Sequence, residues 1–404
     1  METMSVDRKN YFDHIAKNFY QQSLSVKIPF RYRFNYWLYY VLLARKGTPV
    51  HSTTQDALYA DGRLKRGYEK YLAKINQWIC QNYPETEHHI QIPTFNADEI
   101  KESEVPYLMN LRIPFVLKGG TRDLKMMDWD LDYFEQNFGD CDIPINTAPD
   151  KPAQNKFEKT KASNYYDFRP GKVKEVIDSI KQGGNLRSVA VEDVMHQQDG
   201  RLISDLNIPK FERMSGWIDY QHDKLKSRFR VGHILSKQLF LQPSYAYTVW
   251  HLEPGDNFFL LNSGHKTWTM AHPYYSAAFF PRVKKTTTYH GSSIDVREDN
   301  EAQRQRGYDA YTRIPKLQFD VEPGDIVRLP NYWWHTVETH AEQYAIAVTL
   351  RASCMPNTTS IAYLILRMLD EDYHQLVKRI QQGGRVTDED VDLKIFSDLD
   401  QSKN

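Results

Sequence analysis

The sequence predicts a mainly β core with flanking helices, in the form of a double-sheet jelly roll or barrel. Two observations support this prediction. Between Lys237 and Arg351, short apolar or alternating runs are separated by Gly-Asp, Ser-Gly and Pro-Gly turns, which is typical of strands. Outside this region, apolar residues recur at intervals of three and four, which is typical of amphipathic helices.

Residues 1–110 are expected to form a mostly helical N-terminal region. The segment YEKYLAKINQWICQNY carries one apolar stripe, made of Tyr71, Ile75, Trp78 and Ile79. The longest apolar run, Tyr36–Ala44, is too short to span a bilayer, so we expect a buried aromatic helix there.

Residues 111–355 are expected to form the β core. IPFVLKGG, from Ile113, predicts a short buried strand, and MDWDLDYFEQNFGD predicts a helix that ends at Gly139. VKEVIDSIKQGG predicts another amphipathic helix. The remaining strands are predicted within residues 239–253, 257–273, 316–330 and 342–352.

Two polar stretches and the C-terminal segment complete the predicted organisation. Residues 148–171 are expected to form a long loop or lid, and residues 274–315 a polar excursion between strands. Residues 356–404 are expected to be helical, with an apolar stripe from Ile361 to Ile380. That helix would either pack on its own domain or pair with a copy of itself in a homodimer.

Composition narrows the class of protein. Acidic and basic residues balance at 52 each, so there is no basic field to suggest nucleic acid as a partner. The three cysteines, Cys80, Cys141 and Cys354, lack CxxC spacing, which argues against a disulfide scaffold or a structural zinc site. The polar N-terminus is unlike a secretory signal. We therefore expect a soluble, intracellular and cytoplasmic protein without a membrane partner, and a nuclear location stays open.

The chemistry centres on His251, Glu253 and His335. Residues two apart on a strand point to the same face, so His251 and Glu253 are expected to lie together. One more His from a neighbouring strand would complete the 2-His-1-carboxylate triad of non-haem Fe(II) oxygenases. The spacing alone is weak, because about two of the 14 His should have an acidic residue two positions on by chance, and His340 with Glu342 also does.

Three segments in order resemble the cupin-like, JmjC-type family of Fe(II)/2-oxoglutarate oxygenases. They are IPFVLKGG…WDLDYFEQNFGD, then TVWHLEPGDNFFLLNSGHKTWTMAHP, then EPGDIVRLPNYWWHTVE. The resemblance covers residues 110–351 and is nearest to the branch of the asparaginyl hydroxylase that inhibits the hypoxia-inducible factor. It implies a cupin jelly roll in which His251, Glu253 and His335 bind Fe(II).

The resemblance also implies cosubstrate residues. Lys266 would pair with the distal carboxylate of 2-oxoglutarate, and Asn257 would hydrogen-bond the cosubstrate or hold the geometry beside the iron. Position favours Thr248 for a hydroxyl contact to the same carboxylate, whereas strict alternation favours Tyr247, which shares the parity of His251. The family often has a Tyr where this chain offers Arg187 and Ser188, and an Asn where it offers Thr349 or Arg351.

These features imply a hydroxylase that uses Fe(II), 2-oxoglutarate and O2 and releases succinate and CO2. The carboxylate at Glu253 argues against halogenation, because it occupies the position a halide would need. An N-methyl-lysine demethylase with the same site and a non-catalytic cupin binding module are the alternatives. A zinc or nickel cupin such as an isomerase ranks lower. The substrate, whether a small metabolite, an amino acid or a peptide or protein side chain, stays open.

Overall fold

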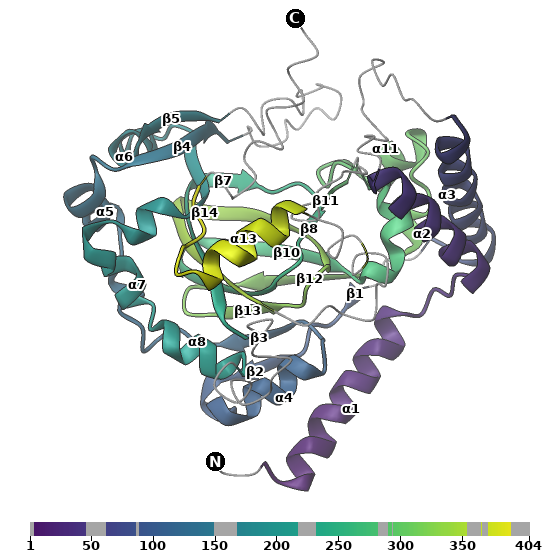
Figure 1. The fold of residues 1–404 in the computed structure, drawn as a ribbon, viewed down its shortest axis with the longest axis horizontal. Coiled ribbons are helices and arrows are strands. Elements are labelled where there is room, and N and C mark those ends of the chain that lie inside the picture. The colour runs from purple at the N-terminus through teal and green to yellow at the C-terminus, as the bar shows by residue number, and fades with distance from the viewer. Residues whose placement is uncertain are drawn as a thin grey trace, which may run out of the picture.

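A large, mostly antiparallel β-sheet forms the core, and helices flank it (Figure 1). The computed structural model describes residues 4–45, 62–85, 89–148, 168–216, 232–281, 290–292, 294–353, 365 and 371–388. Only two strand pairs in this part of the chain, β1–β12 and β2–β3, are parallel. The predicted β core with flanking helices is thereby confirmed.

The strands form two layers that share one strand, β14 (Trp334–Ala352). The C-terminal half of β14 pairs with β9 and β7. Its N-terminal half pairs with β10, with the end of β7 and, at one residue, with β8. The first layer runs, in order of pairing, through β2 (Thr94–Asn96), β3 (Phe115–Lys118), β13 (Ile326–Leu329), β9 (Asp256–Ser263), β14, β7 (Ile234–Tyr247), β6 (Leu186–Val191), β4 (Asp142–Thr147) and β5 (Arg169–Lys172). The second adds β10 (His265–Ala271), β12 (Lys316–Val321), β1 (His89–Ile90), β8 (His251–Leu252) and β11 (His290–Gly291).

A tight turn at Gly264 joins β9 to β10 and so connects the two layers. Gly264 has a φ of +85°, and a Cβ there would lie 2.6 Å from the Cβ of Ala345. Both conditions require glycine. Apolar side chains from β9, β10, β13 and β14 fill the space between the layers, among them Phe259, Trp268 and Val337.

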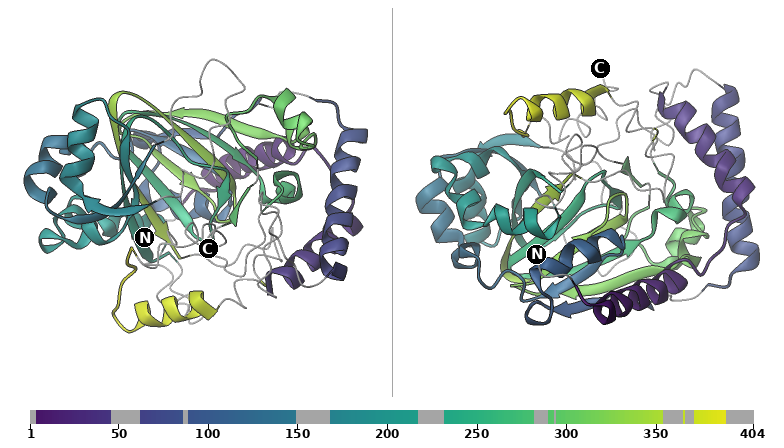
Figure 2. Two further views of the ribbon diagram at one scale, coloured as in Figure 1. Left: turned by 90° about the horizontal axis from the view of Figure 1, so that it is seen from above. Right: turned by 60° about the horizontal axis from the view of Figure 1, so that its bottom comes forward.

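Helices flank the sheet, most of them at its two ends (Figure 2). They are α1 (Val6–Ser23), α2 (Phe30–Arg45), α3 (Gly62–Asn82), α4 (Val105–Asn110), α5 (Leu131–Phe138), α6 (Val173–Lys181), α7 (Arg201–Asp205), α8 (Ile208–Met214), α11 (Asn300–Gln305) and α13 (Glu371–Gln381). Helices α2 and α3 lie side by side at one end, and α5 to α8 lie at the other. No helix in the described ranges is long and apolar enough to cross a membrane.

The N-terminal region is helical as expected, with two differences. In α3 the buried face is Tyr68, Leu72, Ile75 and Ile79, so Tyr71 and Trp78 lie at its edges. In α2, Tyr36 and Tyr40 are buried, but Phe30, Phe34, Leu38 and Leu42 form an exposed stripe. The short strands β1 and β2 were not predicted, because two or three residues are too few to show a period.

The predicted inserts differ from expectation. Of the predicted loop at residues 148–171, residues 149–167 lie outside the described residues. Its last residues belong to strand β5 (Arg169–Lys172), which pairs with β4. The 274–315 stretch is more than a polar excursion, since Tyr275, Phe279 and Tyr311 are buried against α2 and α3. The proposed C-terminal stripe falls largely outside the described residues; within them α13 buries Ile380.

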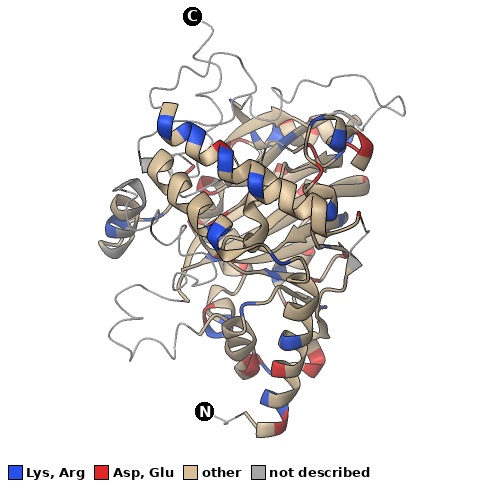
Figure 3. Ribbon diagram, turned by 90° about the vertical axis from the view of Figure 1, so that its right-hand side faces the viewer, with Lys and Arg blue, Asp and Glu red and all other residues tan. Residues whose placement is uncertain are grey.

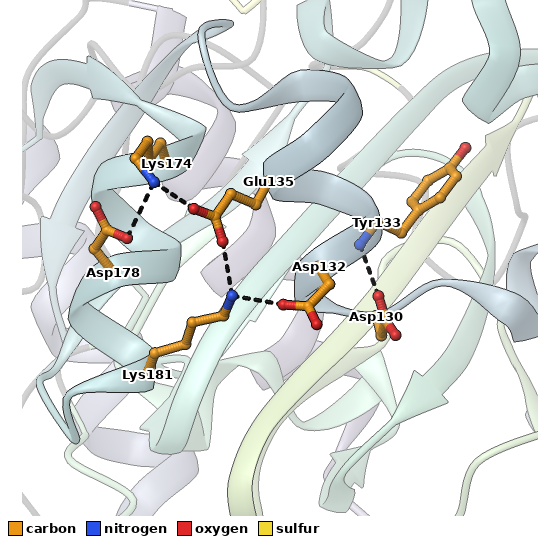
Figure 4. Close-up of polar contacts among 7 residues, drawn as sticks. All are labelled: Asp130, Asp132, Tyr133, Glu135, Lys174, Asp178 and Lys181. Atoms are coloured by element: carbon orange, nitrogen blue, oxygen red, sulfur yellow. Dashed lines mark hydrogen bonds and ion pairs between the residues drawn. The ribbon is translucent and has the colours of Figure 1, made fainter.

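Two groups of charged residues lie on the helices at the ends of the sheet. On the side of α2 and α3, Lys and Arg positions outnumber acidic ones along the helices (Figure 3). Between α5 and α6, Lys181 reaches Asp132 at 2.6 Å and Glu135 at 2.7 Å (Figure 4). Lys181 and Asp132 are solvent-exposed and Glu135 is half-buried, so the network ties the two helices together only weakly.

Candidate metal centre

A small cavity lies between the two layers, and most of the predicted site residues line it. Its volume is about 50 Å³, and one water needs about 10–15 Å³, so it accommodates only a small ligand. The lining side chains come from β7, β8, β9, β10, β14 and the segments beside β8. They are Phe240, Gln242, Thr248, His251, Glu253, Asn257, Phe259, Lys266, Trp268, His335, Val337, Thr339, Thr349 and Arg351.

His251, Glu253 and His335 meet at one end of this cavity. His251 on β8 is directly opposite His335 on β14, and the two ring centroids are 4.0 Å apart. One ligand atom from each of the three residues lies within 4.8 Å of the others. Two imidazoles and one carboxylate in this arrangement match the donor set of the facial triad.

Backbone carbonyls orient both imidazoles. His251 Nδ1 lies 2.8 Å from the carbonyl oxygen of Val249, and His335 Nδ1 lies 3.0 Å from that of Trp333. A carbonyl oxygen can only accept, so each Nδ1 carries a proton, and Nε2 is the ring nitrogen that faces the site and can bind a metal. Burial, together with the neighbouring His251, lowers the pKa of His335 to about 3, which keeps it neutral as a ligand must be.

Glu253 is ionised and held by an arginine. Its side chain is 11% exposed, and Arg351 Nη2 donates to its Oε1 at 2.8 Å while Arg351 Nε donates to its Oε2. Burial acts to raise the pKa of the Glu253 carboxyl, but Arg351 and His251 outweigh it and hold the pKa well below its usual value.

Lys266 lines the same cavity, opposite Thr339, which lies four residues further along β14 than His335. It is 2% exposed, and its Nζ donates to Thr339 Oγ1 at 2.7 Å and to Gln242 Oε1. No acidic side chain in the described part of the chain pairs with it. Burial, with a contribution from Arg187, lowers its pKa to about 7. A buried cation with only neutral partners is a place where a ligand carboxylate fits.

The structure separates the two hydroxyl candidates. Thr248 lines the cavity, and its Oγ1 accepts a bond from the backbone N–H of Val337 at 2.8 Å. Tyr247 is absent from the lining; its ring instead faces Arg297, whose Cζ lies 4.4 Å from the ring centroid. The alternation that favoured Tyr247 does not apply, because β7 ends at Tyr247 and β8 begins only at His251.

Asn257 completes the set of predicted residues. It begins the buried part of β9 opposite Arg351 on β14, and it lines the cavity. Its Oδ1 is buried without a hydrogen-bond partner among the described residues. An orphaned buried acceptor is costly unless a ligand or water meets it.

Several lining residues were not named from the sequence as cosubstrate contacts. Thr339 shares the parity of His335 on β14, so alternation could have found it. Gln242 had no such signal, because only the pairing of β7 with β14 brings it beside Lys266. Arg187 is buried but donates to Asn146 and to the Tyr247 carbonyl, and Ser188 donates to Pro144, so neither lines the cavity. His340 is exposed and distant from the three ligands, as expected.

The family model of the cupin-like domain matches residues 102–350. The match spans more than half of the chain and includes His251, Glu253, His335, Lys266, Asn257, Thr248 and Tyr247. Helices α1 to α3, Arg351 and α13 lie outside it.

Proposed function

The chain belongs to the cupin-like domain family, and from this premise we propose that it is an Fe(II)- and 2-oxoglutarate-dependent oxygenase that hydroxylates a C–H bond. One juxtaposition carries the proposal. Three buried metal-binding side chains and a buried lysine without an acidic partner in the described chain line the same small cavity. The first set fits a divalent metal, and the lysine fits the far carboxylate of a keto acid.

The residues present fit the metal. His251 and His335 would bind Fe(II) through Nε2 and Glu253 through a carboxylate oxygen, leaving other positions open for cosubstrate and oxygen. When bound, Fe(II) and 2-oxoglutarate with O2 supply the oxidation: one oxygen atom enters the C–H bond, and the other converts the keto acid into succinate and CO2.

The residues present also fit the cosubstrate. Lys266, aligned by Thr339 and Gln242, would bind the distal carboxylate of 2-oxoglutarate, with Thr248 as a further hydroxyl. Asn257 would meet the end of the keto acid nearer the metal ligands. A lysine surrounded by neutral partners gains more from an incoming anion than one that already has a carboxylate.

The chain's other contribution is to orient the metal ligands and to exclude water from the cavity. Trp268 stacks on the His335 ring at 5.6 Å between centroids, and Phe259 and Val337 provide apolar walls. The cavity is too small for the cosubstrate and a large substrate together, so the substrate would present one C–H bond at its edge. This suits a side chain of an amino acid, peptide or protein, as in the asparaginyl hydroxylase branch, and equally the tip of a small metabolite.

Succinate formation tests the proposal. Fe(II), 2-oxoglutarate and O2 should yield succinate with the wild-type chain, and H251A should abolish it because one of three ligands is lost. H340A is the matched control: His340 has the same spacing to an acidic residue but is exposed, so this variant should retain turnover. Formaldehyde release with a methylated lysine would indicate demethylation instead. If the wild-type chain forms no more succinate than H251A does, the result would favour a non-catalytic binding module.

A further inference from the structure

We propose that Arg351 is a positioning residue for the metal-binding carboxylate of Glu253, and that the two side chains are matched in length. The inference rests on the proposed function, since it concerns how the same site is held. It is carried by the two hydrogen bonds between Arg351 and Glu253 and by where each residue sits in the sheet.

The backbone of Glu253 is weakly held. It follows β8, which is only two residues long, meets β14 at a single pair, His251 with His335, and pairs with β11 only through His251 and Leu252, so that Glu253 lies beyond both pairings. Among the described residues, the N–H of Tyr332 donates a backbone bond to the carbonyl oxygen of Glu253, at 2.7 Å. The ladder therefore does not fix the direction of its side chain.

The backbone of Arg351 is firmly held. It lies within β14, flanked by Ser236 on β7 and Asn257 on β9. Its guanidinium presents a rigid fork that matches both oxygens of a carboxylate. The well-anchored residue thus determines where the carboxylate of the loosely anchored one lies.

The same contact leaves the carboxylate able to bind a metal. Glu253 Oε1 accepts from Arg351 Nη2 at 2.8 Å and lies 3.4 Å from His251 Nε2, within the group of three ligand atoms. Each carboxylate oxygen has two lone pairs, so Oε1 can keep the arginine and still face a metal.

The length of Glu253 is what allows both contacts. An aspartate would be one methylene shorter, about 1.5 Å per C–C bond, and could not keep a 2.8 Å bond to Arg351 while reaching the two histidines without backbone movement. The glutamate and the arginine therefore depend on each other.

Metal affinity, measured without turnover, tests the pair. Anaerobic calorimetric titration with Fe(II), and with Mn(II) as a redox-stable probe, gives the Kd of the wild-type chain, R351M, R351K, E253D and E253D/R351M. Loss of an outer-shell partner typically weakens metal binding about 10–100-fold, and we expect R351M to fall in this range and R351K, which keeps the charge but not the fork, to fall between. Adding R351M to E253D should change the Kd little, because the shorter carboxylate has already lost the arginine.

R297M is the matched control. Arg297 makes a similar fork to Asp295, with Nη2 2.7 Å from Oδ2 and Nε 3.0 Å from Oδ1, and it is absent from the cavity lining. Its loss should leave the metal Kd unchanged. Wild-type-like or tighter binding in R351M, or in R351K if R351M does not fold, would overturn the inference, as would additive effects in the double variant. Metal binding that is absent from the wild-type chain, or that survives H251A, would instead overturn the proposed function.

Discussion

The affinity for 2-oxoglutarate should fall as pH rises through neutrality, because Lys266 must carry a proton to bind a carboxylate. Burial and Arg187 lower its pKa to about 7 in the ligand-free site. An incoming carboxylate stabilises the charged form and returns the pKa towards its ordinary value of about 10.4. Below pH 7 the lysine is already protonated and the affinity should be flat; above pH 7 binding requires uptake of a proton.

The magnitude follows from that difference in pKa. With a ligand-free pKa of about 7, the apparent Kd should rise about 25-fold between pH 6.5 and 8.5, or roughly 2 kcal/mol, if the bound lysine stays protonated throughout. The slope should approach one decade per pH unit at the alkaline end. Methionine at position 266 cannot titrate, so K266M should bind more weakly and show no such slope.

Calorimetry of 2-oxoglutarate binding to the anaerobic metal-loaded chain measures both quantities. Titrations in buffers of different ionisation enthalpy should show uptake of nearly one proton at pH 8.5 and much less at pH 6.5. K266M reports any pH dependence that comes from the metal or its ligands. A Kd that stays constant from pH 6.5 to 8.5, or a slope that persists in K266M, would refute the assignment of Lys266 to the carboxylate.

Two further predictions concern contacts of known geometry. T248V should weaken 2-oxoglutarate binding by roughly 5–10-fold, as expected for one hydrogen bond, whereas T248S and Y247F should bind as the wild type does; the reverse ranking would reinstate Tyr247. R328M should lower the free energy of unfolding in urea by about 3–5 kcal/mol, because Arg328 is 1% exposed and its loss breaks the ion pair with Asp256 and the hydrogen bonds to the carbonyl oxygens of Ile113 and Met109. K181M, in the exposed cluster between α5 and α6, should lower the free energy of unfolding far less than R328M does, and an equal loss for both variants would contradict this ranking.

The sequence was sufficient to predict the class of fold and where the main strands lie along the chain. Turn signals at Ser263-Gly264 and Pro323-Gly324 mark where the chain reverses, and alternation along β10 correctly places Lys266, Trp268 and Met270 on one buried face. Such local patterns survive in the structure because each has a single physical cause, either a turn or the pleat.

Other features depend on contacts between distant segments and could not be predicted. The break after Tyr247 that turns Thr248 into the cavity has no turn residue to announce it. The pairing of Gln242 with Lys266 requires the register of β7 on β14. The fork from Arg351 to Glu253 joins residues 98 positions apart. From the sequence, Thr349 and Arg351 were only alternatives for the place where the family often has an Asn.

The most direct test of the central claim is the visible spectrum of the anaerobic complex. A keto acid chelated to Fe(II) in a site of this kind gives a charge-transfer band that neither component gives alone. The wild-type chain should develop this band when Fe(II) and 2-oxoglutarate are added together, with a stoichiometry of one, and H335A should not. A wild-type chain that develops no band, or an H335A variant that develops it fully, would contradict the account.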